Sequence, residues 1–243
     1  MRAVPLLRTQ GQKDAIQRSD HHTRYVAALF ESVGTDRIVV VDIHNEAAFD
    51  NAFRCVTVRI PGADIFVEHV LAQLDSTPCV VASPDVGGIK RAQLFRELLA
   101  RKTGKEIELV FVEKRRAGEV LSGGAIVGNP EGRAAIVLDD LCASGSTLIK
   151  AAAALRAAGA TSVHAAVTHT PLEDGLAALA AADDIAQVII TDSVGYAPGA
   201  ASLGKRGKVK ILPCGELLGC AMARMMNGDP IAPLAEHWPP PTK

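Results

Sequence analysis

The sequence predicts an α/β fold, in which parallel strands are covered by helices. Short runs rich in β-branched residues alternate with longer amphipathic stretches rich in alanine and leucine, which is the pattern of parallel strands joined by helices. The chain has 243 residues and is 48% hydrophobic, so it is long enough to bury a full core. This length fits one large or two modest α/β domains.

The expected strands and helices alternate along the chain. The strands are expected at residues 37–42, 78–83, 107–112, 133–139, 162–168, 187–191 and 209–212. The helices are expected at residues 23–32, 65–74, 88–101, 147–158, 174–181 and 215–226. The helix at 147–158 is rich in alanine and leucine, as expected where a helix packs closely on a sheet, and Gly159 suits its C-cap.

The turn signal Ile60-Pro61-Gly62 is the best internal boundary. Residues 1–61 read as a partial N-terminal domain, because one expected strand and one expected helix cannot close a core. We expect this segment to pack on the C-terminal helix at about residues 213–228, on further chain, or on another subunit. Residues 62–212 would form the main domain, and residues 229–243 a tail.

Composition excludes several classes of function. The net charge is −1 and no long Lys/Arg block is present, which argues against nucleic-acid binding and favours a small-molecule partner. The five cysteines form no CxxC pair and no zinc spacing, so they read as reduced thiols. No apolar run reaches the roughly 20 residues of a membrane span, and no secretory leader is recognisable. We therefore expect a soluble, cytoplasmic protein.

Residues 135–147 carry the most informative pattern, running from an apolar strand through two acids into a hydroxyl-rich helix start. Asp139 and Asp140 end the strand, where their carboxylates can reach ribose hydroxyls or a hydrated Mg²⁺. The turn that follows offers hydroxyls and free N–H groups at a helix N-terminus, which favours a bound phosphate. It consists of Ser144, Gly145, Ser146 and Thr147. The alternative is that the acids merely end a strand and Ser144 caps a helix.

This segment resembles the phosphate-binding loop of type I phosphoribosyltransferases and of phosphoribosyl pyrophosphate (PRPP) synthetases. The resemblance implies that Asp139 and Asp140 bind the ribose hydroxyls and that residues 144–147 bind the 5-phosphate of ribose 5-phosphate. Many members carry a third acid where this chain has Ala143, and in purine phosphoribosyltransferases that acid contacts the base. Ala143 therefore disfavours transfer to a base.

The stretch Ser83-Pro84-Asp85-Val86-Gly87-Gly88 follows an expected strand and opens a helix. Taken alone, it is a turn in which Asp85 caps the helix, or one in which the glycines let backbone approach a ligand at the carboxyl edge of the sheet. PRPP synthetases carry a similar Ser-Pro-Asp-x-Gly-Gly stretch at a comparable distance before their phosphate loop. That resemblance implies that Asp85 lies near Mg²⁺-ATP and the ribose phosphate.

Lys114, Arg115 and Arg116 follow the expected strand at 107–112. Such a run is most often a solvated surface, but three cations beside a phosphate site can also neutralise charge on a transferred pyrophosphoryl group. The synthetases place catalytic Lys and Arg residues on a flexible loop at this point. The resemblance implies catalytic roles for Lys114 and Arg116, although Arg115 and Arg116 are hard to tell apart.

His44 follows the first expected strand within Asp42-Ile43-His44. A lone histidine at a strand end is usually a satisfied hydrogen-bonding group. The synthetases have Asp-x-His at this position, where the histidine contacts the ATP phosphates. The resemblance thus implies that His44 binds ATP and, with Asp85, forms a Mg²⁺ site.

The similarity to PRPP synthetases runs from about Tyr25 to Met226. It implies transfer of pyrophosphate from Mg²⁺-ATP to ribose 5-phosphate, giving PRPP and AMP, by a homo-oligomer such as a dimer or hexamer. Only residues 8–14 resemble the family's ATP-gripping loop in the first domain, and poorly. Two alternatives stay open: a stand-alone phosphoribosyltransferase that uses PRPP, and a non-catalytic homologue that regulates synthetase subunits. No P-loop, GxGxxG or Gly-x-Ser-x-Gly motif competes.

Overall fold

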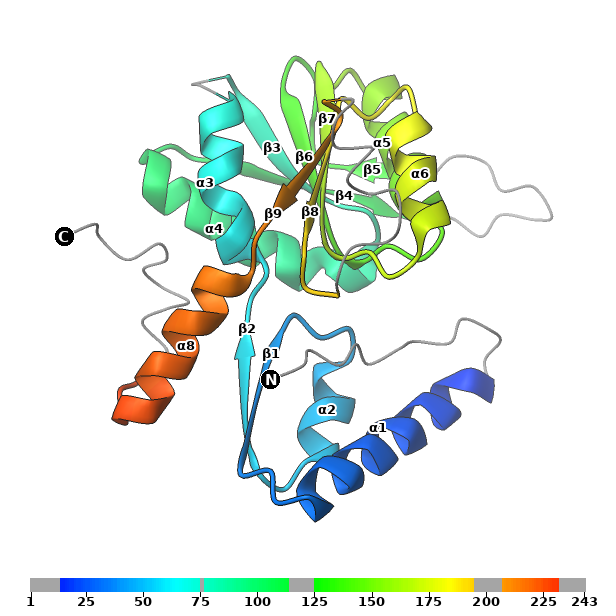
Figure 1. Ribbon diagram of the computed structural model, residues 1–243. Helices are drawn as coiled ribbons and strands as arrows, with labels where there is room; N and C mark the ends of the chain where they lie inside the picture. Colours follow the sequence, from blue (N-terminus) through cyan, green and yellow to red (C-terminus); the bar gives the residue numbers. More distant parts are fainter. Residues whose placement is uncertain (1–13, 75–76, 114–124, 195–206, 232–243) are drawn as a thin grey trace. The chain divides into compact units, whose positions relative to one another are not determined.

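The computed structural model describes residues 14–74, 77–113, 125–194 and 207–231 (Figure 1). The chain divides into two compact units, Met1–Pro61 and Gly62–Lys243, which meet at the Pro-Gly turn. Each unit is described by itself. Within the described ranges, no helix combines the length and the apolar character needed to cross a membrane.

The described part of the first unit, residues 14–61, contains a pair of parallel strands and two helices. Its elements are α1 (Asp14–Ser32), β1 (Arg37–Val41), α2 (Glu46–Ala52) and β2 (Val56–Ile60). Its small core includes Ala27, Phe49 and Phe53, and the two phenylalanine rings lie 4.7 Å apart. The expectation of one strand and one helix was wrong. Both α2 and β2 are short. The main sequence signal for α2 is its N-cap residue Asn45, whose side chain accepts a hydrogen bond from the N–H of Ala48 at 2.9 Å.

The second unit is built on a seven-stranded sheet in the order β5-β4-β3-β6-β7-β8-β9. Its strands are β3 (Cys79–Ser83), β4 (Glu108–Glu113), β5 (Ala125–Val127), β6 (Ala134–Leu141), β7 (Ser162–His169), β8 (Gln187–Thr191) and β9 (Val209–Leu212). Its helices are α3 (Ala63–Leu74), η1 (Val86–Gly88), α4 (Ile89–Thr103), α5 (Ser146–Ala157), α6 (Glu173–Ala181) and α8 (Gly215–Asn227). All strand pairs are parallel except β4 with β5. The predicted α/β fold class is therefore confirmed.

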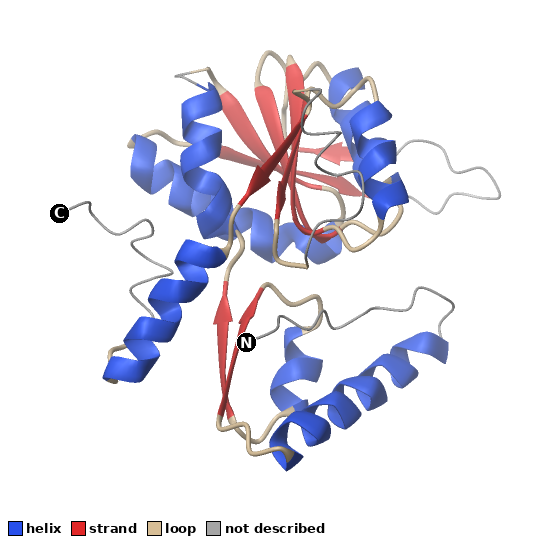
Figure 2. Cartoon of the chain, viewed as in Figure 1, coloured by secondary structure: helices blue, strands red, loops and turns tan. Residues whose placement is uncertain are grey.

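Helices cover both faces of this sheet (Figure 2). Because successive strand residues face opposite sides, Val80 and Ala82 of β3 pack in the core with α5 and α6, whereas Val81 packs with α3 and α4. The central strand β6 is buried on both sides, since its first five residues are all inaccessible to solvent. This double burial explains why β6 reads in sequence as a continuous apolar run rather than an alternating one.

The clearest further differences from the predicted elements are at β5 and α1. β5 was not predicted; it is a three-residue strand in which Val127 pairs with Phe111 of β4. α1 begins at Asp14, nine residues earlier than the predicted start at Thr23. α8 is grouped with the second unit, so the expectation that residues 213–228 complete the first unit stays a prediction.

Candidate active site

The carboxyl ends of β3 and β6 meet at one edge of the sheet in the second unit. The two strands pair in parallel, with Ala82 opposite Val137. The Ser-Pro-Asp turn after β3 and the acid pair at the end of β6 therefore leave the sheet at the same edge. This is the edge at which open α/β sheets bind their ligands.

The acid pair Asp139 and Asp140 is held by an arginine from a neighbouring helix. Arg91, in the first turn of α4, places Nη2 3.1 Å from Asp140 Oδ2 and Nη1 3.7 Å from Asp139 Oδ1. The backbone N–H of Asp140 also donates to Asp139 Oδ1 at 2.9 Å. The Asp140 side chain is 3% exposed and that of Asp139 is 19% exposed. Asp139 is thus the acid that solvent, and hence a ligand, reaches more easily.

Burial also changes the proton affinity of the pair. Desolvation and, to a smaller extent, the neighbouring Asp140 carboxyl raise the pKa of Asp139 to about 7, although the Arg91 charge opposes this rise. A carboxyl with this pKa exchanges its proton near neutral pH. Such perturbed acids in an accessible position are typical of functional sites.

The turn between β6 and α5 presents hydroxyls at a helix N-terminus. Gly145 is the N-cap of α5 and adopts φ +74°, a left-handed conformation that glycine adopts without strain. The Ser144 and Ser146 hydroxyls lie 3.0 Å apart. The first N–H groups of a helix have no acceptor within the helix, so α5 and these hydroxyls together can bind an anion.

Helix α6 and strand β7 fix the shape of this turn. A Cβ at Gly175 of α6 would lie 2.2 Å from the carbonyl oxygen of Ala143, and one at Gly145 would lie 3.0 Å from that of Gly175. The N–H of Cys142 donates to the His169 carbonyl at 2.8 Å. Cys142 is buried, and desolvation raises its pKa to about 11, so its thiol stays protonated and fills space.

Asp85 caps the short helix η1, as its capping interpretation predicts. Its Oδ1 accepts the N–H of Gly88 at 3.2 Å, and the Ser83 hydroxyl donates to the Asp85 carbonyl at 2.6 Å. A Cβ at Gly88 would lie 2.7 Å from Ser83 Oγ, so this close turn requires glycine. Capping does not exclude ligand binding, because a carboxylate accepts several hydrogen bonds.

The structure brings Asp85, the acid pair and residues 144–147 to one edge of the second unit. His44 lies in the first unit, exposed in the connection between β1 and α2, so its predicted role at the same site stays a prediction. Lys114, Arg115 and Arg116 lie outside the described residues, directly after β4. Arg91 was missed from sequence; the available signal was a basic residue in the first turn of the helix that the glycine pair opens.

Comparison with known proteins identifies the family of the chain. The phosphoribosyl transferase domain matches residues 59–197. A ribose-phosphate pyrophosphokinase of Hyphomonas neptunium is 33% identical over 224 residues, which cover 90% of this chain and 68% of that protein. The chain belongs to the ribose-phosphate pyrophosphokinase family.

Other members of the ribose-phosphate pyrophosphokinase family show the same extent of similarity. The protein of this name from Pasteurella multocida is 31% identical over 210 residues, 86% of this chain and 64% of its own length. The crystal structure of phosphoribosylpyrophosphate synthetase from Mycobacterium smegmatis matches with a TM-score of 0.69 at 25% identity, covering 85% of this chain and 64% of that one. The chain thus spans about two thirds of the length of these relatives.

The donor chemistry at the sheet edge fits magnesium. Among the described residues no three His, Cys, Asp or Glu side chains form a metal-binding group. Mg²⁺ needs no such cage, because it keeps several waters and is usually bound through one or two carboxylates and substrate phosphates. The carboxylate of Asp85 suits that mode of binding.

Proposed function

We propose that this chain binds ribose 5-phosphate at the carboxyl edge of β6 and transfers pyrophosphate to it from Mg²⁺-ATP, giving PRPP and AMP. The observation that carries the proposal is the placement of an acid pair and a hydroxyl-rich helix start on either side of one short turn. Membership of the ribose-phosphate pyrophosphokinase family supports the same reaction.

The sugar phosphate is recognised at both of its ends. Asp139 and Asp140 accept hydrogen bonds from the ribose hydroxyls. The 5-phosphate accepts hydrogen bonds from the hydroxyls and N–H groups of residues 144–147, and the dipole of α5 adds about 0.3–1 kcal/mol, or roughly 2 kcal/mol when partly buried. Two separate contacts fix the orientation of the ribose, and with it the position of its anomeric oxygen.

The transfer requires mainly positioning and charge stabilisation. The anomeric hydroxyl oxygen attacks the β-phosphorus of ATP, the bond from that phosphorus to the α,β-bridging oxygen breaks, AMP leaves, and the hydroxyl proton passes to solvent. We assign Lys114 and Arg116, with Arg115 as the alternative to Arg116, to stabilise the charge on the transferred group. His44 is assigned to the ATP phosphates. Mg²⁺, held by Asp85 with His44 as the second predicted ligand, would neutralise part of the phosphate charge when bound.

Calorimetry with ribose 5-phosphate tests the binding site. Removing the hydroxyl in Thr147→Val should weaken binding at least about tenfold, because a hydrogen bond to a charged group contributes roughly 1.5–3 kcal/mol. Thr161→Val, at an exposed position of the same unit, is the matched control and should bind as the wild type does. Equal affinity of the Thr147→Val variant and the wild type would contradict the assignment of the phosphate to this turn.

An assay of AMP release from ATP and ribose 5-phosphate tests the reaction. Formation of AMP and PRPP in equal amounts is the expected result. Ribose 5-phosphate binding without AMP release, in the presence of Mg²⁺, would favour the non-catalytic homologue. Consumption of PRPP with a free base would favour the phosphoribosyltransferase, which the absence of an acid at Ala143 disfavours.

A further inference from the structure

Arg91 is the side chain that joins the two halves of the site. It lies in the first turn of α4, directly after the Ser-Pro-Asp turn, and its guanidinium faces both acids at the end of β6. A Cβ at Gly88 would lie 3.8 Å from Arg91 Nη1, so the guanidinium lies beside the glycine that shapes the turn. Arg91 is therefore positioned by the Ser-Pro-Asp turn and acts on the acid pair at the end of β6.

The burial of these charges explains why a partner is needed. The Asp140 side chain is 3% exposed and that of Arg91 is 18% exposed, so both charges are largely removed from water. A buried carboxylate without a partner is costly, and removal of one member of a buried pair leaves the other uncompensated. Arg91 thus supplies a positive charge that stabilises the buried Asp140 carboxylate.

The two contacts of the guanidinium are unequal. At 3.1 Å, Nη2 is within hydrogen-bond distance of Asp140, whereas Nη1 is 3.7 Å from Asp139 and attracts it only electrostatically. This leaves the more exposed Asp139 better able to accept a hydrogen bond from a ligand. The side chain of lysine has a single nitrogen. It therefore cannot reproduce the planar guanidinium group, which reaches both carboxylates with two nitrogens.

We propose that Arg91 is a positioning residue that fixes the acid pair in the arrangement that recognises the vicinal hydroxyls of ribose. This inference rests on the proposed ribose 5-phosphate site. Arg91 acts through Asp139 and Asp140 and does not bind the 5-phosphate, which is held by the turn at the start of α5. Its loss should therefore impair recognition of the hydroxyls and leave recognition of phosphate intact.

Calorimetry with three ligands separates these effects: ribose 5-phosphate, 2-deoxyribose 5-phosphate and inorganic phosphate. We expect the wild type to prefer ribose 5-phosphate over its 2-deoxy analogue by about tenfold, the value of roughly one hydrogen bond to a charged group. Arg91→Gln should reduce this preference to about twofold or less while inorganic phosphate binds as before. Arg91→Lys, which restores the charge without the fork, should give an intermediate preference.

Arg96→Gln is the matched control, because Arg96 lies on the same helix and donates to the Ile107 carbonyl at 3.3 Å. It should keep the wild-type preference. An unchanged preference in Arg91→Gln, or in Arg91→Lys if the glutamine variant does not fold, would overturn the inference. A parallel loss of inorganic phosphate binding would also overturn it, by making Arg91 a phosphate ligand. Failure of the wild type to bind any of the sugar phosphates would instead refute the proposed function.

Discussion

The second unit contains two polar clusters on the same sheet, and only one of them has the properties of a ligand site. The first is the acid pair at the carboxyl edge of β6, with Arg91 as its counter-charge. The second lies under α3 and includes His69 of α3, His164 of β7 and Gln187 of β8, which pairs with His164 in the sheet. Burial shifts pKa values in both clusters, so a shifted pKa alone does not identify the site.

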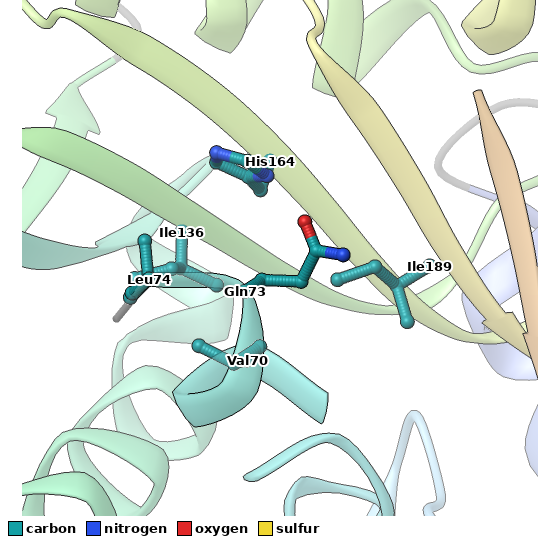
Figure 3. Close-up of a pocket in the computed structure, with 6 residues that line it drawn as sticks. All are labelled: Val70, Gln73, Leu74, Ile136, His164 and Ile189. Atoms are coloured by element: carbon teal, nitrogen blue, oxygen red, sulfur yellow. The ribbon is translucent and has the colours of Figure 1, made fainter. Parts of the chain in front are cut away.

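Both histidines of this cluster are partly buried, and the described side chains that shift their pKa values, Gln187, Lys210 and His69, include no acid. The neighbouring pocket, which is too narrow for a water molecule, is shown in Figure 3. It is lined by Val70, Gln73, Leu74, Ile136, His164 and Ile189. Desolvation lowers the pKa of both histidines, and the Lys210 charge lowers that of His69 further. These histidines are kept neutral, which suits a packed interior.

The comparison shows that location and counter-charge distinguish a ligand site from an interior polar cluster. The acid pair lies where strands end and a helix begins, so backbone N–H groups and hydroxyls can join it in binding a ligand. His164 lies near the start of β7, where backbone groups are already paired within the sheet, and His69 lies on α3. The variants described next should affect ligand binding at the first cluster and folding stability at the second.

The largest effect is expected for the basic residues after β4. Lys114→Ala should lower kcat for AMP release by on the order of 10²-fold or more, the scale of losing one electrostatic stabiliser of a transition state, with little change in ribose 5-phosphate affinity. Lys150→Ala, at an exposed position on α5, is the control and should turn over normally. Unchanged turnover in Lys114→Ala would show that Lys114 is a solvated surface charge without a role in catalysis.

The next effect separates the two clusters directly. Asp139→Asn should weaken ribose 5-phosphate binding by about 10- to 100-fold, because the amide keeps the shape but loses a charged acceptor contributing roughly 1.5–3 kcal/mol. His164→Gln should leave this affinity unchanged. Calorimetry of both variants would refute the distinction if the histidine variant lost affinity and the aspartate variant did not.

Ribose 5-phosphate binding should tighten as pH rises. A group with a pKa of about 7 is mostly protonated at pH 6 and mostly ionised at pH 8, and only the ionised Asp139 accepts freely from the sugar hydroxyls. We expect an affinity gain approaching about tenfold across this range, after correction with a simple phosphate monoester, whose phosphate group titrates near pH 6 as that of the ligand does. A pH-independent corrected affinity would exclude Asp139 as the titrating acceptor.

The smallest effects concern folding stability without ligand. The contributions of the two clusters to the unfolding free energy should change with pH in opposite directions. Between about pH 4 and pH 7 folded Asp139 binds more protons than its unfolded counterpart, so its contribution falls as pH rises. The histidines have a lowered pKa when folded, so their contribution is present above about pH 6.5 and is lost as pH falls below that value.

Urea unfolding between pH 5 and pH 8 would measure both contributions. Asp139→Asn should remove a decrease of the unfolding free energy with rising pH, and His164→Gln should remove an increase. Two variants with the same change of slope would contradict the assigned environments.

Much of the fold followed from the sequence, because buried parallel strands read as apolar runs of recognisable length. β8 and β9 have the bounds that their patterns predict, whereas β5, β2 and α2 are short and are stabilised by neighbours distant in sequence. The acid pair and the hydroxyl turn were predictable because they are contiguous. The ion pair of Arg91 with Asp140 was not predictable. These two residues are far apart in sequence, and they meet only because β3 and β6 are adjacent.

The histidine cluster was hidden for the same reason. His69 and His164 are separated by almost a hundred residues, and each looked like an isolated polar residue. Only the packing of α3 on β7 and β8 brings them into one environment, where His69 lowers the pKa of His164. Contacts that depend on the rotation of a helix about its axis are the part that local patterns do not predict.

A titration of the ¹⁵N-labelled protein with ribose 5-phosphate, followed by NMR, tests the central claim most directly. The account predicts saturable shifts of the backbone amide signals of Asp140, Gly145 and Thr147, with the signals of His164 and Gln187 unchanged. The result that would contradict it is the reverse pattern, or no saturable shift at the β6–α5 turn at millimolar ribose 5-phosphate.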